Sequence, residues 1–341
     1  MSDLDSNMKR VAISNDALLL SRTDIEQCLD MAQTVSVVEE VFRAHGEGRI
    51  VMPAKIKLDM TSLGIPSWMS AMPAYVEPAG LYGLKFAGGF INNPSQHNLP
   101  FVMGSMMLFD PQTGVLVAVM EAGYITSMRT GAVAGVAARY LARRDSSIVA
   151  FIGCGVQART SLQALDLVLD LKEIRAVDIE AQARDRLVGQ ARELGIPARA
   201  AKDIQDAVEG AEIIVVATTA VGPLVMKDWV KSGAFVAKLG SYQELDDALT
   251  LSADKLIVDH REQAEHKGEL AHMFEGGRLT QDGIYGEVGD IVARILPGRE
   301  HDREVIIAAM IGMGTEDVGV GAQVLRRAKQ LGLGQRFDFL A

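Results

Sequence analysis

The chain of 341 residues is long for one domain and sufficient for two. Hydrophobic residues make up 48% and charged residues 23%, the balance of a soluble globular protein, and the net charge is −10. This acidity argues against a nucleic-acid partner, because neutralising phosphates needs a basic face, but a small anionic substrate can still bind in a local basic pocket. Two cysteines, Cys28 and Cys154, are too few for a disulfide framework. With no secretory signal and no apolar run of about 18 residues, we expect a cytoplasmic protein away from membranes.

The first part of the chain combines a helix with short strands. Thr23 and Glu26 have the spacing of a capping box, and apolar residues at helical spacing from Val35 to Phe42 predict a helix that ends near Gly46. Residues 110–114 predict a turn between strands at 106–109 and 115–120. We therefore expect an antiparallel meander with at least one helix packed on it.

The middle of the chain alternates between helices and strands. Residues 127–144 predict a buried helix, because its many glycines and alanines let another backbone approach closely. The expected strands are 148–152, 176–179, 212–217, 234–239 and 256–258, with helices at 158–169 and 182–194. These strands are apolar throughout, as in a parallel sheet with helices on both faces. The sequence therefore predicts a doubly wound α/β domain, followed by an apolar run at 305–311 and a helix at 315–331 that returns to the first domain.

The strand at 148–152 ends in a Gly-x-Gly-x-x-Ala turn that opens a helix, the context that a dinucleotide-binding motif requires. Gly153 permits the tight turn, Gly155 lets the backbone approach a pyrophosphate, and Ala158 keeps helix and strand close. Asp178 follows at the distance of a residue that accepts hydrogen bonds from ribose hydroxyls and repels a 2′-phosphate. We expect NAD rather than NADP, although the basic side chain of Arg184 nearby is a feature that would favour NADP. The alternative is a glycine turn that binds no nucleotide.

Two cationic residues stand among apolar neighbours. Lys85 lies in a glycine-rich strand segment, and Arg129 lies in the first turn of the helix expected at 127–144. A cation at a helix N-terminus opposes the helix dipole, so we expect an anion to be shared between Arg129 and the free N–H groups. The alternatives are a structural salt bridge for Arg129 and a solvent-facing side chain for Lys85. Lys55 is a third candidate.

In these segments the chain resembles the ornithine cyclodeaminase/mu-crystallin family. The matching segments are 52–55, 71–73, 83–85, 108–114, 126–132, 138–142, 153–158 and 314–317. The resemblance implies a homodimer in which residues 1–125 and 305–341 form a substrate-binding and dimerisation domain, and residues 126–304 form a Rossmann NAD-binding domain. It also implies NAD(P) chemistry at the Cα–N bond of an amino or imino acid.

The resemblance also implies the site residues. Lys85 and Arg129 match family residues that hold the substrate carboxylate at the reacting centre, so both are expected to be catalytic. Lys55 stands in place of an arginine that contacts the same carboxylate, and it keeps the charge but loses the two-pronged geometry. The expected cofactor contacts are Gly153, Gly155, Val156, Gln157, Ala158, Asp178, Thr130 and Thr218.

Two positions depart from the cyclodeaminase pattern. Ser70 stands where cyclodeaminases carry a glutamate, and the loop 239–246 lacks an acid at the place where they recognise the substrate's second amine. The prediction is therefore an NAD-dependent imine reductase or amino-acid dehydrogenase. The first alternative is a cyclodeaminase with tightly held NAD, and the second is a non-catalytic binding protein like mu-crystallin. The substrate's side chain stays open.

No metal site is expected. The six histidines show no adjacent ligand spacing, and we expect His260 and His266, with Asp259 and Glu269, to form a solvated loop and helix face. Cys154 is expected to be a small filler in the glycine turn, because no histidine lies near it in sequence to activate it.

Overall fold

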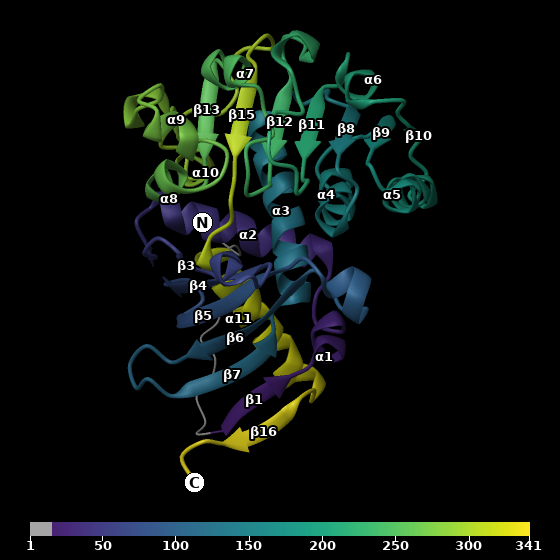
Figure 1. Cartoon of the computed structure of the whole chain (residues 1–341). Coiled ribbons are helices and arrows are strands. Elements are labelled where there is room, and N and C mark those ends of the chain that lie inside the picture. Colours follow the sequence, from purple (N-terminus) through teal and green to yellow (C-terminus); the bar gives the residue numbers. More distant parts are fainter. Residues whose placement is uncertain (1–15) are drawn as a thin grey trace. The chain divides into compact units, whose positions relative to one another are not determined.

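The computed structural model describes residues 16–341, which divide into two compact units. The first unit comprises residues 16–129 and 313–341, and the second comprises residues 130–312 (Figure 1). The helix α3 (Gly123–Leu141) runs from the first unit into the second. Among the helices of residues 16–341, none combines the length and apolar character that crossing a bilayer requires.

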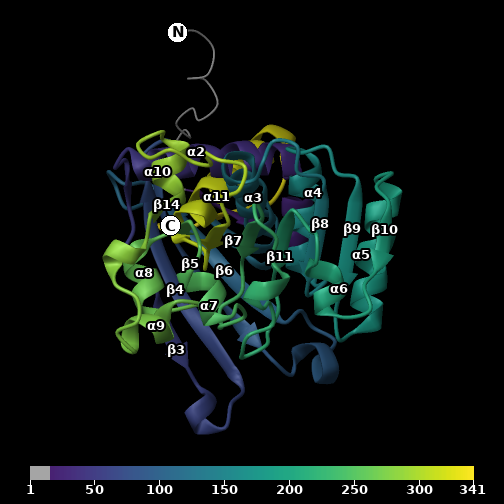
Figure 2. The same ribbon diagram turned by 90° about the horizontal axis from the view of Figure 1, so that it is seen from above.

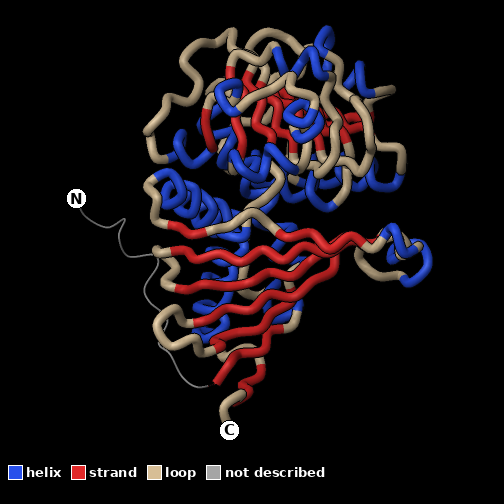
Figure 3. Tube along the Cα trace, turned by 60° about the vertical axis from the view of Figure 1, so that its left-hand side comes forward, coloured by secondary structure: helices blue, strands red, loops and turns tan. Residues whose placement is uncertain are grey.

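The first unit is built on an eight-stranded, mostly antiparallel sheet in the order β16-β1-β7-β6-β5-β4-β2, with β3 also paired to β4 (Figure 3). Its strands are β1 (Asp16–Leu20), β2 (Ile50–Val51), β3 (Ile56–Asp59), β4 (Ser67–Val76), β5 (Leu81–Phe90), β6 (Val102–Phe109), β7 (Leu116–Glu121) and β16 (Gln335–Asp338). Its helices are α1 (Arg22–Glu26), α2 (Met31–Gly46) and α11 (Gly314–Leu331), with a 3₁₀ turn at Thr61–Leu63 and a π turn at Asn93–His97. The expected meander is confirmed, since β4 to β7 pair in succession.

Alternation along the strands gives this sheet two different faces. On the buried face, Lys85 of β5 stands in a cross-strand row with Met72 of β4 and Met106 of β6. The helix α11 packs on these strands, and a Cβ on its Gly321 would lie 2.1 Å from Cε of Met106. The glycine therefore lets α11 approach the sheet closely.

The start of the first unit corrects one expectation. The capping box is made by Ser21 and Asp24, not by Thr23 and Glu26, and it opens only the short helix α1. A second cap, Asp30, then opens α2, which ends at Gly46 as expected. Two short-range caps in succession divide what the pattern predicted as one helix.

The second unit is a parallel sheet in the order β10-β9-β8-β11-β12-β15-β13-β14 (Figures 1 and 2). Its strands are β8 (Ile148–Ile152), β9 (Glu173–Val177), β10 (Ala198–Ala200), β11 (Ile213–Val216), β12 (Phe235–Lys238), β13 (Lys255–Val258), β14 (Gly286–Glu287) and β15 (Ile306–Ala309). Its helices after α3 are α4 (Val156–Asp166), α5 (Ala181–Glu193), α6 (Ile204–Val208), α7 (Asp247–Leu251), α8 (Arg261–His266), α9 (Ala271–Glu275) and α10 (Val288–Val292), with 3₁₀ turns at Lys227–Trp229 and Gln281–Gly283. The predicted Rossmann-type α/β class is confirmed, and the strand order reverses between β8 and β11, where such sheets bind ligands.

The expectation for the glycine- and alanine-rich helix α3 is also confirmed. A Cβ on Gly131 would lie 2.4 Å from the carbonyl carbon of Thr160, and one on Gly135 would lie 2.8 Å from the Cβ of Ala164. Both neighbours belong to α4, so α3 and α4 pack backbone against backbone. This contact buries α3 beside the helix that starts at the glycine turn.

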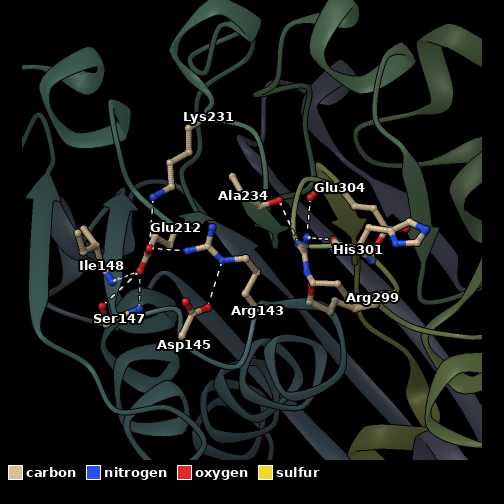
Figure 4. Close-up of polar contacts among 11 residues, drawn as sticks. Arg143, Asp145, Ser147, Ile148, Glu212, Lys231, Ala234, Arg299, His301 and Glu304 are labelled. Atoms are coloured by element: carbon tan, nitrogen blue, oxygen red, sulfur yellow. Dashed lines mark hydrogen bonds and ion pairs between the residues drawn. The ribbon is translucent and has the colours of Figure 1, made fainter.

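A polar network ties together the amino ends of the parallel strands (Figure 4). Glu212, just before β11, accepts hydrogen bonds from the N–H groups of Ser147 (2.6 Å) and Ile148 (3.2 Å) at the start of β8. Its other oxygen pairs with Arg143 (2.7 Å) and Lys231 (3.3 Å). The carboxylate therefore satisfies main-chain donors of one strand and two cations from neighbouring segments.

Replacing Glu212 tests how much this network stabilises the second unit. We expect Glu212→Ala to lower the free energy of unfolding by about 3 kcal/mol, because it leaves partly buried donors and cations unpaired. The matched control is Asp145→Ala, which removes an 82% exposed carboxylate from the same Arg143 and should cost less than about 0.5 kcal/mol. Urea denaturation followed by circular dichroism measures both, and equal losses would contradict the expectation.

The same carboxylate should make stability depend on acid. Burial disfavours its ionised form, but the N–H groups of Ser147 and Ile148 and the Lys231 ammonium outweigh burial and hold the pKa of Glu212 below its usual value. The pKa of Glu212 is lower in the folded protein than in the unfolded chain. The ionised carboxylate therefore contributes its full share of the folding stability above the unfolded-state pKa, and that share is lost as pH falls through the folded-state pKa.

Candidate active site

The glycine turn has the geometry that a dinucleotide requires. Gly153 has φ +82°, and a Cβ there would lie 2.6 Å from the carbonyl oxygen of Ala217 and 2.8 Å from the methyl of Thr218. Gly155 is exposed, and a Cβ on it would meet no atom within 4 Å. Gly153 therefore lets the turn pass against β11, whereas Gly155 leaves open space in front of the helix.

The start of α4 fits an anionic ligand. Gly155 is the N-cap of this helix and supplies no side-chain oxygen, so no side chain caps the first N–H groups. The side-chain oxygen of Gln157 is buried and has no hydrogen-bond partner among the described residues. Val156 is exposed at the first helical position, and Ala158 is fully buried. The uncapped N–H groups at this helix start, with open space in front of Gly155, fit a pyrophosphate.

Asp178 lies directly after β9 and against the glycine turn. One carboxylate oxygen accepts a hydrogen bond from the N–H of Cys154 (2.6 Å), and the other accepts from the N–H of Glu180 (2.8 Å). These bonds fix the carboxylate at the edge where a ribose is expected. Arg184, whose charge would favour NADP, pairs with Asp185 (2.8 Å). Burial raises the pKa of Cys154 to about 12, which fits its expected role as a filler.

The first unit places Lys85 and Arg129 on one carboxylate. Nζ of Lys85 lies 2.6 Å from one oxygen of Asp317, and Nε of Arg129 lies 3.2 Å from the other. Arg129 also pairs with Glu316 at 2.9 Å, and Lys85 donates a hydrogen bond to Thr126 at 3.3 Å. The two cations and two carboxylates are at most 6% exposed, so the structure joins them in a buried ionic cluster at the start of α11.

The structure overturns the expectation that Arg129 shares an anion with the free N–H groups of a helix start. The helix α3 begins at Gly123, so Arg129 lies in its second turn rather than its first. The side chain of Glu121 accepts hydrogen bonds from the N–H groups of Gly123 and Tyr124 and so occupies the helix start. Arg129 therefore compensates the carboxylates of Glu316 and Asp317 and shares no anion with free helix N–H groups.

The cluster changes the acid–base behaviour of Lys85. Burial, and next the charge of Arg129, lower the pKa of Lys85 to about 8, although Asp317 and Glu316 act in the opposite direction. An ammonium group with this pKa exchanges its proton near neutral pH. Asp317 and Glu316 complete the cluster, and motif analysis did not assign them, although the segment 314–317 was among those that matched the family.

The remaining expected residues take no part in the contacts just described. Lys55 is half-buried in the segment between β2 and β3. Thr130 is buried in α3, beside the packing contact with α4. Thr218 follows β11 and lies against Gly153. Ser70 is buried on the Lys85 side of the sheet, two residues before Met72, the strand partner of Lys85.

The predicted solvated loop and helix face is wrong for Asp259 and Glu269, although His266 is exposed and His260 is half-buried. Asp259 is fully buried and accepts hydrogen bonds from the N–H groups of Ile311 and Gly312. Glu269 is 1% exposed and accepts from the N–H groups of Glu244 and Leu245. Both carboxylates therefore bind main chain. Within residues 16–341, no group of three histidine, cysteine, aspartate or glutamate side chains is placed to hold a metal ion.

Comparison with known proteins identifies relatives along nearly the whole chain. The family model of the ornithine cyclodeaminase/mu-crystallin family matches residues 15–331. Alanine dehydrogenase from Archaeoglobus fulgidus is 35% identical over 330 residues, which cover 95% of this chain and 99% of the relative.

Two solved structures share the fold closely. An archaeal alanine dehydrogenase dimer with bound NAD superposes with a TM-score of 0.90 at 34% identity, over 95% of this chain and 100% of that one. The Δ1-pyrroline-2-carboxylate reductase of Thermococcus litoralis, in complex with NADH and L-proline, gives a TM-score of 0.89 at 31% identity, over 93% and 99% of the two chains.

Charge removal at Asp317 tests the electrostatics of the cluster. We expect a small carboxylate such as pyruvate to bind wild-type protein more weakly as pH rises through about 8, because the Lys85 ammonium is lost. Asp317→Asn removes a group that raises the pKa of Lys85, so the weakening should begin at lower pH. Titration calorimetry between pH 6 and 10, with NAD present, measures the change. Glu316→Gln is the matched control and should shift the profile less; an unchanged profile for Asp317→Asn would refute this account.

Proposed function

Because the chain belongs to the ornithine cyclodeaminase/mu-crystallin family, we propose that it is an NAD-dependent oxidoreductase acting on the Cα–N bond of an amino acid or its α-imino acid. The observation that carries this proposal is the buried cluster of Lys85, Arg129, Glu316 and Asp317. It accompanies a glycine turn and Asp178 that fit NAD. When bound, NADH supplies the hydride that reduces a C=N bond.

The charges of the cluster suit a zwitterion. Two cations, Lys85 and Arg129, bind the substrate carboxylate, whereas Asp317 faces the positive charge on the imine or amine nitrogen. Because the formal charges of the four side chains cancel, a zwitterion is favoured over a simple anion. Lys85, with its pKa near 8, holds or passes the proton that the nitrogen exchanges. Lys55 adds a third cation to the carboxylate side.

The cofactor contacts belong to the second unit. The N–H groups at the start of α4 and the amide of Gln157 bind the pyrophosphate, and Thr218 and Thr130 adjoin it. Asp178 binds the ribose hydroxyls and disfavours NADP.

Cys28 and Cys154 are both buried free thiols, as in a protein of the reducing cytoplasm.

Reduction or dehydrogenation is favoured over cyclodeamination. Ser70 lies on the same buried face as Lys85, so at this position the chain offers a hydroxyl where a cyclodeaminase offers a carboxylate. A second amino group would therefore lack one of its expected anionic partners.

We further propose a homodimer formed through the open face of the first unit's sheet. Phe86 is 42% exposed, and Ile56 and Leu58 of β3 extend the same apolar face. Tyr82 and Phe109 stack on it with ring centroids 5.0 Å apart. A continuous apolar sheet face of this kind needs a cover, and the archaeal relative is a dimer.

Turnover tests the proposed function. Wild-type protein should oxidise NADH, measured at 340 nm, with a keto acid plus ammonia or with a cyclic imino acid. It should release no ammonia from ornithine. Lys85→Met should lower kcat/KM by about 1,000-fold, since it removes the carboxylate partner and the proton carrier together.

Lys172→Met is the control for Lys85→Met, because its side chain is 64% exposed and lies in the second unit. It should retain wild-type rates. NADH binding without turnover on any of these substrates would favour the binding-protein alternative, and ammonia plus proline from ornithine would favour the cyclodeaminase.

Sedimentation equilibrium tests the dimer. Wild-type protein should have twice the mass of one chain, and Phe86→Glu should shift it towards the monomer, because a charge on the apolar face opposes its burial. Leu167→Glu, at an exposed leucine in the second unit, should leave the mass unchanged. A dimer unaffected by Phe86→Glu would place the interface elsewhere.

A further inference from the structure

Among the buried ionisable side chains of the second unit, three form a cluster that the proposed chemistry does not use. Lys238, Glu244 and Glu269 are each at most 1% exposed. Lys238 ends β12, Glu244 lies in the loop that follows, and Glu269 lies between α8 and α9. Removing charges from water is costly unless every one is compensated, so this cluster must hold defined partners.

Lys238 is the centre of the cluster. Its ammonium lies 2.7 Å from one oxygen of Glu244 and 3.6 Å from Glu269, and it donates a hydrogen bond to the carbonyl of Gly240 at 2.7 Å. Glu269 accepts hydrogen bonds from the N–H groups of Glu244 (2.7 Å) and Leu245 (3.0 Å). All of these contacts act on the loop after β12, which they fix at several points.

Glu244 connects this loop to the loop after β11. Its second oxygen accepts hydrogen bonds from the N–H (2.8 Å) and the hydroxyl (2.5 Å) of Thr218. Its carbonyl accepts from the N–H groups of Leu224 (2.7 Å) and Val225 (3.1 Å). Glu244 therefore fixes the positions of Thr218, Leu224 and Val225, all of which follow β11.

Close packing continues from the cluster to the glycine turn. A Cβ on Gly240 would lie 2.0 Å from Glu244, so only glycine lets the carboxylate stand here. The methyl of Thr218 lies 2.8 Å from the position of a Cβ on Gly153. A continuous set of contacts thus runs from Lys238 through Glu244 and Thr218 to the dinucleotide turn.

We propose that Lys238, Glu244 and Glu269 form a positioning cluster that holds the loops after β11 and β12 in the conformation that binds the nicotinamide half of NAD. This inference rests on the proposed function, because it assigns a role within the same cofactor site. Both loops follow the carboxyl ends of parallel strands, next to the point where the strand order reverses and ligands bind. Holding them in place beforehand lowers the ordering cost of binding.

The location distinguishes this cluster from the network of Glu212. Glu212 precedes β11 and binds the amino ends of the strands, whereas Glu244 binds residues beyond their carboxyl ends. We therefore expect loss of Glu212 to affect stability alone and loss of Glu244 to affect cofactor affinity as well. This gives the experiment an internal control.

Glu244→Gln is the decisive variant. Its amide has one acceptor oxygen and one NH₂ group, which only donates, so the NH₂ group faces either the Lys238 ammonium or the N–H of Thr218. It cannot satisfy both partners, and Thr218 loses its fixed position. Lys238→Met combined with Glu244→Gln removes the ammonium, so the amide oxygen can again accept from Thr218.

The test measures the dissociation constants of NADH and of 5′-AMP by titration calorimetry, with folding checked by urea denaturation. Glu244→Gln should weaken NADH binding by about tenfold or more and leave 5′-AMP binding unchanged, because AMP reaches only the Asp178 side. The double variant should recover most of the lost affinity. Glu212→Ala should leave the affinity of its folded fraction unchanged.

Other outcomes overturn the inference in distinguishable ways. NADH affinity within twofold of wild type in Glu244→Gln, or an equal loss of NADH and AMP binding, refutes positioning of the nicotinamide half. If Glu244→Gln does not fold, Glu269→Gln carries the same comparison, and unchanged NADH affinity in that variant refutes it. Wild-type protein that binds no NADH overturns the proposed function itself, and the inference falls with it.

Discussion

The proposed active site depends on one buried ion pair, the contact of Lys85 with Asp317 at 2.6 Å. Asp317 also accepts from Arg129, so a single carboxylate joins β5, α3 and the start of α11. A buried cation without this partner would be strongly destabilised, and a carboxylate without the cations would take up a proton. The interaction therefore positions two cations side by side. Burial and the charge of Arg129 then lower the pKa of Lys85 to about 8, against the opposing effect of Asp317.

The second unit separates stability from binding along the length of its strands. Glu212 satisfies donors and cations at the amino ends, where a parallel sheet binds no ligand. At the carboxyl ends, where such sheets bind ligands, Gly153, Gly240 and Glu244 make the close contacts described above.

Local patterns predicted the fold well. The apolar runs and the glycine turn identified the parallel sheet, and the small residues of α3 identified a buried helix. The start of α3 was misplaced because Glu121 caps it from two residues upstream, and glutamate is not a usual capping residue. The family resemblance predicted Lys85 and Arg129, but sequence separation hid their partners, since Arg129 and Asp317 are 188 residues apart. The expected domain boundaries at 125/126 and 304/305 stay predictions; the contacts divide the chain at 129/130 and 312/313.

Isotope transfer is the most direct measurement of the central claim, that this chain holds the α-carbon of an imino acid for hydride transfer. NADH deuterated at both C4 positions of the nicotinamide is supplied with a cyclic imino acid, and the product is analysed by mass spectrometry. We predict one deuterium on the α-carbon of the amino acid formed by wild-type protein and about 1,000-fold slower incorporation with Lys85→Met. Product without deuterium on the α-carbon, or no product from any imino acid supplied, would contradict this claim.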